Sequence, residues 1–482
     1  MPRTRYGLAL LCLTASACSG PDTTAAPEHV QTSAFAVPAS SGSGLAMVFE
    51  ADLVAIGNGG VSTQVAGPSV AVGVIGAGAG EVLDTFEAGS TDVLLGPTSA
   101  WVLQRSTTAW TSTLGDPPTT PFTHVTRVDR TSLKETGSLT FSEPLVNPAV
   151  LSDSVILDAV PSTSSDVARA VFLRAYDLDG AAAPTSLVSD QGFAAAACFA
   201  SGGAVLAYEP ARAVGTISVV AAQPDSSGWT LPRMSIPHYR LDPTAIGCSD
   251  DAGRALLSVI ATADGQSHVL LVDIVKMAVV VDAVGLQGPL ALRGDGAAGL
   301  ALETSNQGLV FFDASTQIPV AVPGVVALQQ PWQAGDLTLW TFGEEEDTVA
   351  VVHLADGSID PTFDAGAAPL VSAWPAGPGF VVGQEDDNGP GDLPLTRLSL
   401  LRSGQVESLP LGSVLNAPSL AAIAGSTLYT LTSPTTSGAA DAAAPATASL
   451  QVYDLDTGAL TSTLPLPVCN TATAEAMKGC SL

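Results

Sequence analysis

The chain carries few basic and few aromatic residues. Lys and Arg number 17 against 46 Asp and Glu, giving a formal net charge of −29 over 482 residues, and Phe, Trp and Tyr make up only 5%. A surface this acidic repels phosphate backbones, so we expect no nucleic-acid partner. Hydrophobic residues nevertheless make up 46% of the chain and charged residues only 13%. This balance excludes a wholly disordered protein and favours a substantial core.

Short catalytic and metal-binding motifs are also missing. The sequence has no C-x-x-C, H-E-x-x-H or G-x-S-x-G, which are typical of metal sites and serine hydrolases. Residues 76–81, G-A-G-A-G-E, depart from the dinucleotide-binding G-x-G-x-x-G at Glu81, and we interpret them as a Gly-rich hairpin. The histidines are far apart in sequence: His29, His124, His238, His268 and His353. We therefore expect no cofactor. A hydrolase or lyase site in a central channel is the least favoured hypothesis.

Acidic turns are the remaining candidates for a metal site. Carboxylates cluster at Glu344–Asp347 and Glu385–Gly389, and in the pairs Asp177/Asp179 and Asp454/Asp456. Oxygen-rich loops can hold Ca²⁺, but none of these has EF-hand spacing, so we favour solvated turns and keep calcium as the alternative. Ser249–Leu256 resembles the Asp-box turn of sialidase-type propellers, S-x-D-x-G-x-x-W, with Leu256 replacing Trp. That resemblance implies a structural turn without chemistry.

The N-terminus carries an export signal. Arg3 and Arg5 precede a short apolar stretch, and Ala15-Ser16-Ala17-Cys18 follows it. This arrangement resembles bacterial lipoprotein signals, although Ala15 stands where Leu is usual. The resemblance implies cleavage before Cys18 and lipidation of its thiol, and Ser19 after it implies the outer membrane of a Gram-negative host. Cleavage after Ala17 without a lipid is the alternative, and it would leave a periplasmic or secreted protein.

The sequence divides into four segments. We assign residues 1–17 to the signal peptide, 18–44 to a disordered Ser/Thr/Ala/Pro-rich tether, 45–466 to a folded domain and 467–482 to a C-terminal tail. No later run is apolar enough to span a bilayer, because Val269–Val281 contains Asp273 and Lys276 and is better interpreted as strands. Membrane contact is therefore expected only through the N-terminal lipid.

Four cysteines remain beyond the signal and Cys18. In an oxidising compartment an even number favours disulfides, and three pairings are open. We favour Cys469–Cys480, which closes a short loop in the tail. Cys198–Cys248 then remains, and these two cysteines occupy matching places in successive repeats.

A two-part pattern recurs through the folded domain. The first part is a small-residue strand, a turn and an apolar strand, as around Cys198 and Cys248. The second is an apolar strand that ends in an Asp or Gly turn, as in Leu173–Gly180 and Val452–Gly458. The combined period of about 40 to 54 residues and four strands per period predict an all-β propeller. We count about nine candidate units and favour eight blades, with seven as runner-up. A β-sandwich array is the competing architecture.

The last unit carries a resemblance to known propeller repeats. Val452–Leu464 resembles the strand–turn–strand of WD40-like and quinoprotein-like repeats, without the Trp-Asp dipeptide of the first or the Trp after Thr-Gly of the second. The resemblance implies the fold and no function. We favour a monomeric interaction module that binds another envelope protein. The alternative is a carbohydrate- or small-ligand-binding propeller that uses Trp110 or Trp229.

Overall fold

The chain forms strands throughout its described part. The computed structural model describes residues 145–179, 184–226 and 228–305 continuously, and outside these ranges mainly the strands between residues 37 and 465. No helix occurs in the described ranges, and hence none there is long and apolar enough to cross a membrane. The predicted all-β class is confirmed. The predicted signal, Cys18, Cys469, Cys480 and the tail lie outside the described residues.

Seven of the described sheets have four antiparallel strands each. Six are meanders in chain order, and the first contains an inserted hairpin, β3 (Val54–Ile56) and β4 (Ser62–Gln64). The first sheet consists of β1 (Val37–Pro38), β2 (Gly44–Ala51), β5 (Ser69–Gly76) and β6 (Gly80–Phe86), and the second of β7 (Ser90–Leu95), β8 (Ser99–Ser106), β9 (Phe122–Asp129) and β10 (Glu135–Phe141). The third consists of β19 (Tyr239–Cys248), β20 (Arg254–Ala261), β21 (Ser267–Asp273) and β22 (Ala278–Val284), the fourth of β23 (Leu286–Leu292), β24 (Ala298–Glu303), β25 (Leu309–Asp313) and β26 (Gln317–Val320), and the fifth of β27 (Trp332–Ala334), β28 (Leu337–Phe342), β29 (Thr348–His353) and β30 (Phe363–Asp364). The sixth consists of β31 (Leu370–Pro375), β32 (Gly379–Asp386), β33 (Leu395–Arg402) and β34 (Leu409–Leu415), and the seventh of β35 (Ala421–Ala424), β36 (Thr427–Thr432), β37 (Ser449–Asp454) and β38 (Leu460–Pro465).

An eight-stranded sheet lies between the second and third of these. Its strands are β11 (Pro148–Ser152), β12 (Val155–Ala159), β13 (Thr163–Asp177), β14 (Thr185–Ala200), β15 (Gly203–Pro210), β16 (Thr216–Asp225), β17 (Gly228–Thr230) and β18 (Arg233–Pro237). The long strand β14 belongs to both halves of this sheet. Strand β13 pairs with β14 mainly from Thr185 to Gly192 and again at Ala194–Ala195, whereas β15 pairs with it from Gly192 to Ala200.

We number the four-strand units 1 to 9 in chain order. Units 1 and 2 are the first two sheets, unit 3 runs from β11 to the first half of β14, and unit 4 runs from its second half to β18. Units 5 to 9 are the sheets that begin at β19, β23, β27, β31 and β35. The described strands thus make eight sheets of four or more strands and nine four-strand units. The predicted number of eight blades stays a prediction.

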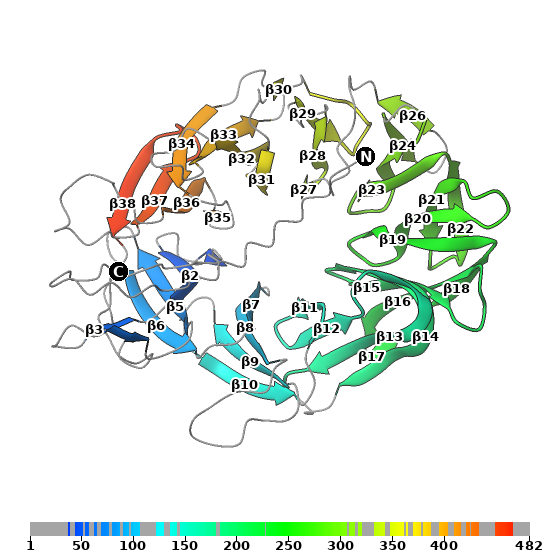
Figure 1. Ribbon diagram of the computed structural model, residues 1–482, viewed down its shortest axis with the longest axis horizontal. Coiled ribbons are helices and arrows are strands. Elements are labelled where there is room, and N and C mark those ends of the chain that lie inside the picture. Colours follow the sequence, from blue (N-terminus) through cyan, green and yellow to red (C-terminus); the bar gives the residue numbers. More distant parts are fainter. Residues whose placement is uncertain are drawn as a thin grey trace, which may run out of the picture.

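The units lie around a ring. In Figure 1 the strands run in chain order from blue (β2, β5, β6) to red (β36–β38), and the first and last units are neighbours in this view. The first strands of consecutive units contact one another at β7–β11, β11–β14, β14–β19, β19–β23, β27–β31 and β31–β35. A ring of antiparallel meanders whose first strands meet at the centre is a β-propeller.

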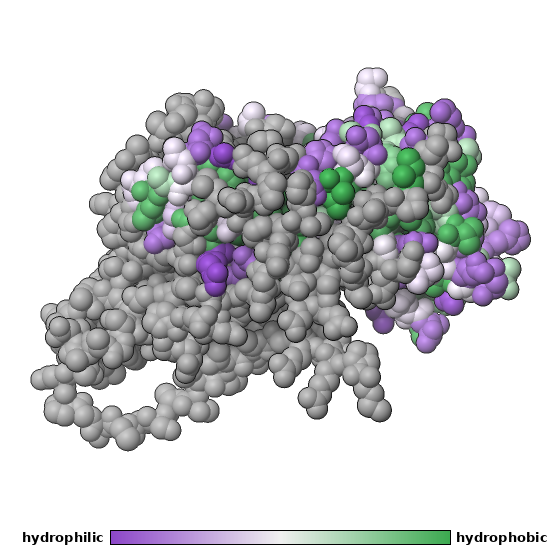
Figure 2. Space-filling model, turned by 90° about the horizontal axis from the view of Figure 1, so that it is seen from above, coloured by the Kyte–Doolittle hydropathy of each residue, from purple (hydrophilic) through white to green (hydrophobic). Residues whose placement is uncertain are grey.

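The core consists of seams between consecutive units. On β15, Val205 and Ala207 pack toward unit 5, whereas Leu206 and Tyr208 pack toward unit 3. Because successive side chains of a strand point to opposite faces, a sheet that is covered on both faces is apolar along its whole length. This explains the high hydrophobic content. On the side shown in Figure 2, hydrophilic and apolar residues are mixed over the described part of the surface.

The turn in the second part of the sequence pattern is hydrogen-bonded to the turn in the first part. In units 3, 5, 7 and 9 a backbone N–H just after the third strand donates to a carbonyl in the turn between the first two strands. These bonds are Leu178 to Ser154 (2.8 Å), Ile274 to Gly253 (2.9 Å), Leu354 to Asp336 (2.7 Å) and Leu455 to Ser426 (2.8 Å). The two-part pattern therefore describes one blade, and the recurring hydrogen bond gives its physical reason. Strand β1 extends the first sheet to Val37, before the predicted boundary at residue 45.

Candidate functional site

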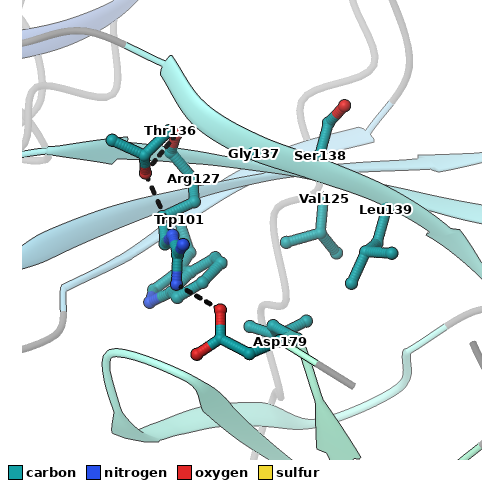
Figure 3. A pocket seen from close by; sticks show the side chains of 9 residues that line it. Trp101, Val125, Arg127, Thr136, Gly137, Ser138, Leu139 and Asp179 are labelled. Atoms are coloured by element: carbon teal, nitrogen blue, oxygen red, sulfur yellow. Dashed lines mark hydrogen bonds and ion pairs between the residues drawn. The ribbon is translucent and has the colours of Figure 1, made fainter. Parts of the chain in front are cut away.

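A cavity of about 260 Å³ lies at the seam between units 2 and 3. Strands β8, β9 and β10 supply most of its wall, and the turn after β13 supplies the rest (Figure 3). Its lining consists of Trp101, Val125, Arg127, Thr136, Gly137, Ser138, Leu139, Leu178 and Asp179. The cavity thus joins residues about 80 positions apart in sequence, and it exists only because two units meet there.

Arg127 organises the polar end of the cavity. Its Nη1 donates to Asp179 Oδ1 (2.9 Å) and to the carbonyl of Asp153 (3.2 Å), and its Nε donates to Thr136 Oγ1 (3.0 Å). Its guanidinium carbon lies 5.5 Å from the ring centre of Trp101, within the range of a cation–π contact. Figure 3 shows Arg127 between the indole and Asp179. These contacts hold the guanidinium in place although 24% of the side chain is exposed.

Strand register explains why these side chains meet. Arg127 pairs with Trp101 on β8 and with Gly137 on β10, so all three lie side by side across the sheet. Two residues along β9, Val125 pairs with Leu139 and points to the same face, which forms the apolar end of the cavity. Gly137 follows a bulge in β10, and a Cβ added there would meet no atom within 4 Å. The mouth of the cavity therefore stays open beside Gly137.

The cavity combines an ion pair with apolar walls. Asp179 is 57% exposed on its side chain, so a polar group that enters from solvent can reach both charges. The volume of about 260 Å³ is slightly below the range of about 300–1,000 Å³ typical of small-molecule and cofactor sites. A single amino-acid side chain suits this space better than a cofactor.

A second polar cluster lies within unit 5, on strands β19, β21 and β22. Tyr239 Oη donates to Asp282 Oδ2 (2.6 Å), and His268 Nδ1 lies 2.7 Å from Asp282 Oδ1. Burial, followed by the hydrogen bond to Asp282, raises the pKa of Tyr239 to about 12. His268 and Tyr239 also touch edge to face at 5.3 Å. This cluster orients the imidazole of His268.

The other described histidines make contacts of their own and are not among the residues that line the cavity. His124 Nδ1 is 2.8 Å from Thr140 Oγ1, and His353 Nε2 is 3.1 Å from Asp360 Oδ1. His238 has a positive φ of 74° at the connection between β18 and β19. Within the described residues no group of three or more His, Cys, Asp or Glu side chains could hold a metal ion. The suggestion of calcium stays a prediction, and Glu344–Asp347 lies outside the described residues.

The predicted acidic turns cap the backbone. Asp177 accepts the N–H of Asp179 (3.0 Å), and Asp454 accepts those of Asp456 (2.7 Å) and Thr457 (3.1 Å). In the Asp-box-like segment, Ser249 Oγ donates to Asp251 Oδ1 (2.5 Å), which also accepts the N–H of Gly253 (2.8 Å). That segment is the turn between β19 and β20, as its resemblance implied.

Cys198 and Cys248 come together across the seam between units 4 and 5. They end the first strands of those units and pack against one core cluster. Both are free thiols in the structure, so the predicted disulfide stays a prediction. Trp229 packs against the core between units 3 and 4, and Trp110 lies outside the described residues. Gly76 ends β5 and Gly80 begins β6, and these strands pair as a hairpin.

Sequence reasoning missed the cavity. Trp101 is 2% exposed, as an ordinary core residue would be, and the sequence predicted Asp179 only as part of an acidic turn. The repeat was the one feature of the sequence that pointed to this site, because it places the acidic turn of each unit beside the start of a neighbouring strand. Nothing in the sequence showed which pair of units leaves a space between them.

Comparison with known proteins adds little to this description. No family model and no curated protein matches the chain. A solved structure described as dihydro-heme d1 dehydrogenase NirN in complex with DHE is 11% identical over 71% of each chain, with a TM-score of 0.39. The computationally designed Ika8 protein is 13% identical over 63% of this chain and 86% of its own, with a TM-score of 0.33. With both scores below 0.5, the propeller assignment rests on the described sheets.

Proposed function

We propose that this protein is an exported lipoprotein whose propeller captures another protein of the cell envelope. The lipid is attached to Cys18, and the residues between Cys18 and the start of β1 at Val37 form the tether between the membrane and the ring. The outer membrane is the proposed address, because Ser19 follows the cysteine. The net charge of −29 favours a partner with a basic contact surface, because opposite potentials steer association.

The cavity at the seam of units 2 and 3 is the observation that carries this proposal. A side chain with an apolar body and a polar tip would lie on Val125 and Leu139 and reach Arg127 or Asp179 with its tip. Protein interfaces are commonly anchored by one such side chain, most often aromatic or Arg, in a small desolvated pocket. The volume of about 260 Å³ favours an anchor of this kind over a larger free ligand.

The anchor hypothesis can be tested in living cells. A photo-crosslinking amino acid replaces Thr136, which is exposed and lines the cavity with its side chain beside Arg127, and illumination should give one adduct of defined protein mass. Gly137→Trp fills the cavity and should remove that adduct. Gly137→Ala adds only a methyl group to open space and should keep it. An adduct that survives Gly137→Trp, or no adduct at Thr136, would refute capture at this cavity.

The proposed address needs a separate test. The wild-type chain should incorporate labelled palmitate and partition with outer-membrane fractions, whereas Cys18→Ser should lose both properties. A wild-type mature chain that begins at residue 18 without a lipid would replace the anchor with a soluble periplasmic or secreted form. That outcome would leave the result at Thr136 unaffected, so the two parts of the proposal fail independently.

A further inference from the structure

The described cysteines sit at a covalently bridgeable place in the ring. Cys198 lies near the end of β14, and Cys248 is the last residue of β19. The adjoining turns are already joined, since Gly202 N–H donates to the carbonyl of Asp250 (2.6 Å) and Ser201 Oγ donates to the same carbonyl (3.0 Å). The two backbones are therefore held next to each other at the level of the thiols.

The thiols contact each other directly. A side-chain hydrogen bond joins Cys198 and Cys248, and both side chains pack against the core cluster shared by units 4 and 5. Both residues are intermediate in exposure, although the Cys198 thiol itself is buried. Burial, with a further contribution from the neighbouring Cys248, raises the pKa of the Cys198 thiol well above its ordinary value. As a free thiol, Cys198 is therefore a weak nucleophile.

We propose that Cys198 and Cys248 form a disulfide that clasps units 4 and 5 after export. The oxidant is a disulfide donor of the envelope, either a protein or a small molecule, that acts by thiol–disulfide exchange. The Cys248 thiolate attacks the donor disulfide, forms a mixed disulfide and releases one donor thiol. The Cys198 thiolate then attacks Cys248 Sγ and releases the second donor thiol. Two protein thiols are oxidised to one S–S bond while one donor disulfide is reduced to two thiols.

The position gives this bond a mechanical role. It closes a loop over residues 198–248, which contains all remaining strands of unit 4 and the first strand of unit 5. The first strands of these units already contact each other. A cross-link there prevents unit 4 from peeling away from unit 5 and removes freedom from the unfolded chain. This role is independent of partner capture at the cavity between units 2 and 3.

Peptide mapping of the exported full-length protein tests the proposal. The protein is unfolded in guanidinium with iodoacetamide and no reductant, because a buried free thiol would otherwise escape the reagent. Trypsin then places Cys198 in residues 175–212 and Cys248 in residues 241–254. We expect these two peptides to be joined and to become alkylated only after reduction. Complete alkylation of both peptides without reduction, or a link from either one to Cys469 or Cys480, would overturn the proposal.

A thermal comparison separates the clasp from the predicted bond in the tail. In a Cys469→Ser/Cys480→Ser background, reductant should lower the unfolding midpoint by several degrees. The further change Cys198→Ser should abolish that dependence on reductant. If Cys198→Ser does not fold, the peptide map of the wild-type chain still decides. If reductant does not change the unfolding midpoint in the Cys469→Ser/Cys480→Ser background, that result would also contradict the proposed Cys198–Cys248 disulfide.

Discussion

Asp153 joins units 2 and 3, and its removal should weaken that seam measurably. Its Oδ1 accepts the N–H groups of Thr98 (2.9 Å) and Ser99 (2.8 Å), and its Oδ2 accepts the hydroxyl of Thr98 (2.7 Å). Hydrogen bonds to a charged group contribute about 1.5–3 kcal/mol each when they are shielded from water. Asp153 is partly exposed, so we assign about 1 kcal/mol to each bond. Asp153→Ala should therefore cost about 3 kcal/mol.

The effect of Asp153 should also depend on pH. Burial alone would raise the pKa of Asp153, but the hydrogen bonds from Thr98 and Ser99 outweigh it, and the pKa lies below its ordinary value. A carboxyl whose pKa is lowered by folding stabilises the protein above the pKa of the unfolded chain, about 3.9. That contribution is lost as the pH falls through the lower pKa of the folded state. Asp153→Asn keeps an acceptor oxygen and has no charge to titrate, so it serves as the matched control.

Urea denaturation followed by tryptophan fluorescence measures both effects, because Trp101 lies at the same seam. Near pH 7 we expect the order wild type, Asp153→Asn, Asp153→Ala in decreasing stability. Below about pH 3 the advantage of the wild type over Asp153→Asn should shrink. The reasoning is wrong if Asp153→Ala loses less than about 0.5 kcal/mol, the range of ordinary surface substitutions. It is also wrong if the advantage of the wild type over Asp153→Asn is the same at both pH values.

Three further predictions concern other seams and turns. Leu257 is fully buried between units 4 and 5, so Leu257→Ala should cost about 3–4 kcal/mol of stability in denaturant titrations. Ile260 on the same strand is 39% exposed, so Ile260→Ala should cost under about 1 kcal/mol. The hydrogen bond from the Ser249 hydroxyl is the main cause that lowers the pKa of Asp251. Asp251→Ala should therefore cost about 2 kcal/mol of stability near pH 7 and less below about pH 3. An equal loss of stability at both pH values would contradict this prediction. The buried hydroxyl of Thr338 accepts the indole N–H of Trp340 (3.0 Å) and donates to the carbonyl of Val352 (3.1 Å). Thr338→Val should therefore cost about 2 kcal/mol, and Thr338→Ser, which keeps a hydroxyl, much less. Equal losses of stability in the two variants would show that the hydroxyl does not stabilise this site.

The fold class could be predicted because its signals are local. An apolar strand followed by Asp and then Gly, as at Asp454–Gly458, forms a turn wherever it occurs, since the Asp side chain caps the N–H groups that follow it. Repetition of that turn at blade spacing predicted the ring. Strand β14 shows where local signals fail. It continues from unit 3 into unit 4 through Gly192, without a turn, and only a register shift marks the boundary.

Gly192 shows why the blade number was harder to predict. A Cβ at this position would lie 2.7 Å from the carbonyl oxygen of Glu209, so the glycine permits the close approach of β15 where β14 changes partners. In the sequence, the same glycine between Gln191 and Phe193 resembles an ordinary strand interruption. Its role depends on a strand that begins more than ten residues later, and a local pattern does not contain that information.

The thiol pair could be predicted from the repeat in the sequence, whereas the cavity could not. Cys198 and Cys248 occupy equivalent positions in successive units, so the repeat alone predicted that they would meet, and the structure brings them together. The cavity depends instead on an exception to the repeat. Gly137 leaves space beside Arg127 where a side chain would otherwise reach. In a ring of similar blades, equivalent positions give the scaffold, and the single unit that departs from the pattern is where a partner-specific surface can arise. This is why the crosslinker belongs at Thr136, beside Arg127, and the blocking substitution at Gly137.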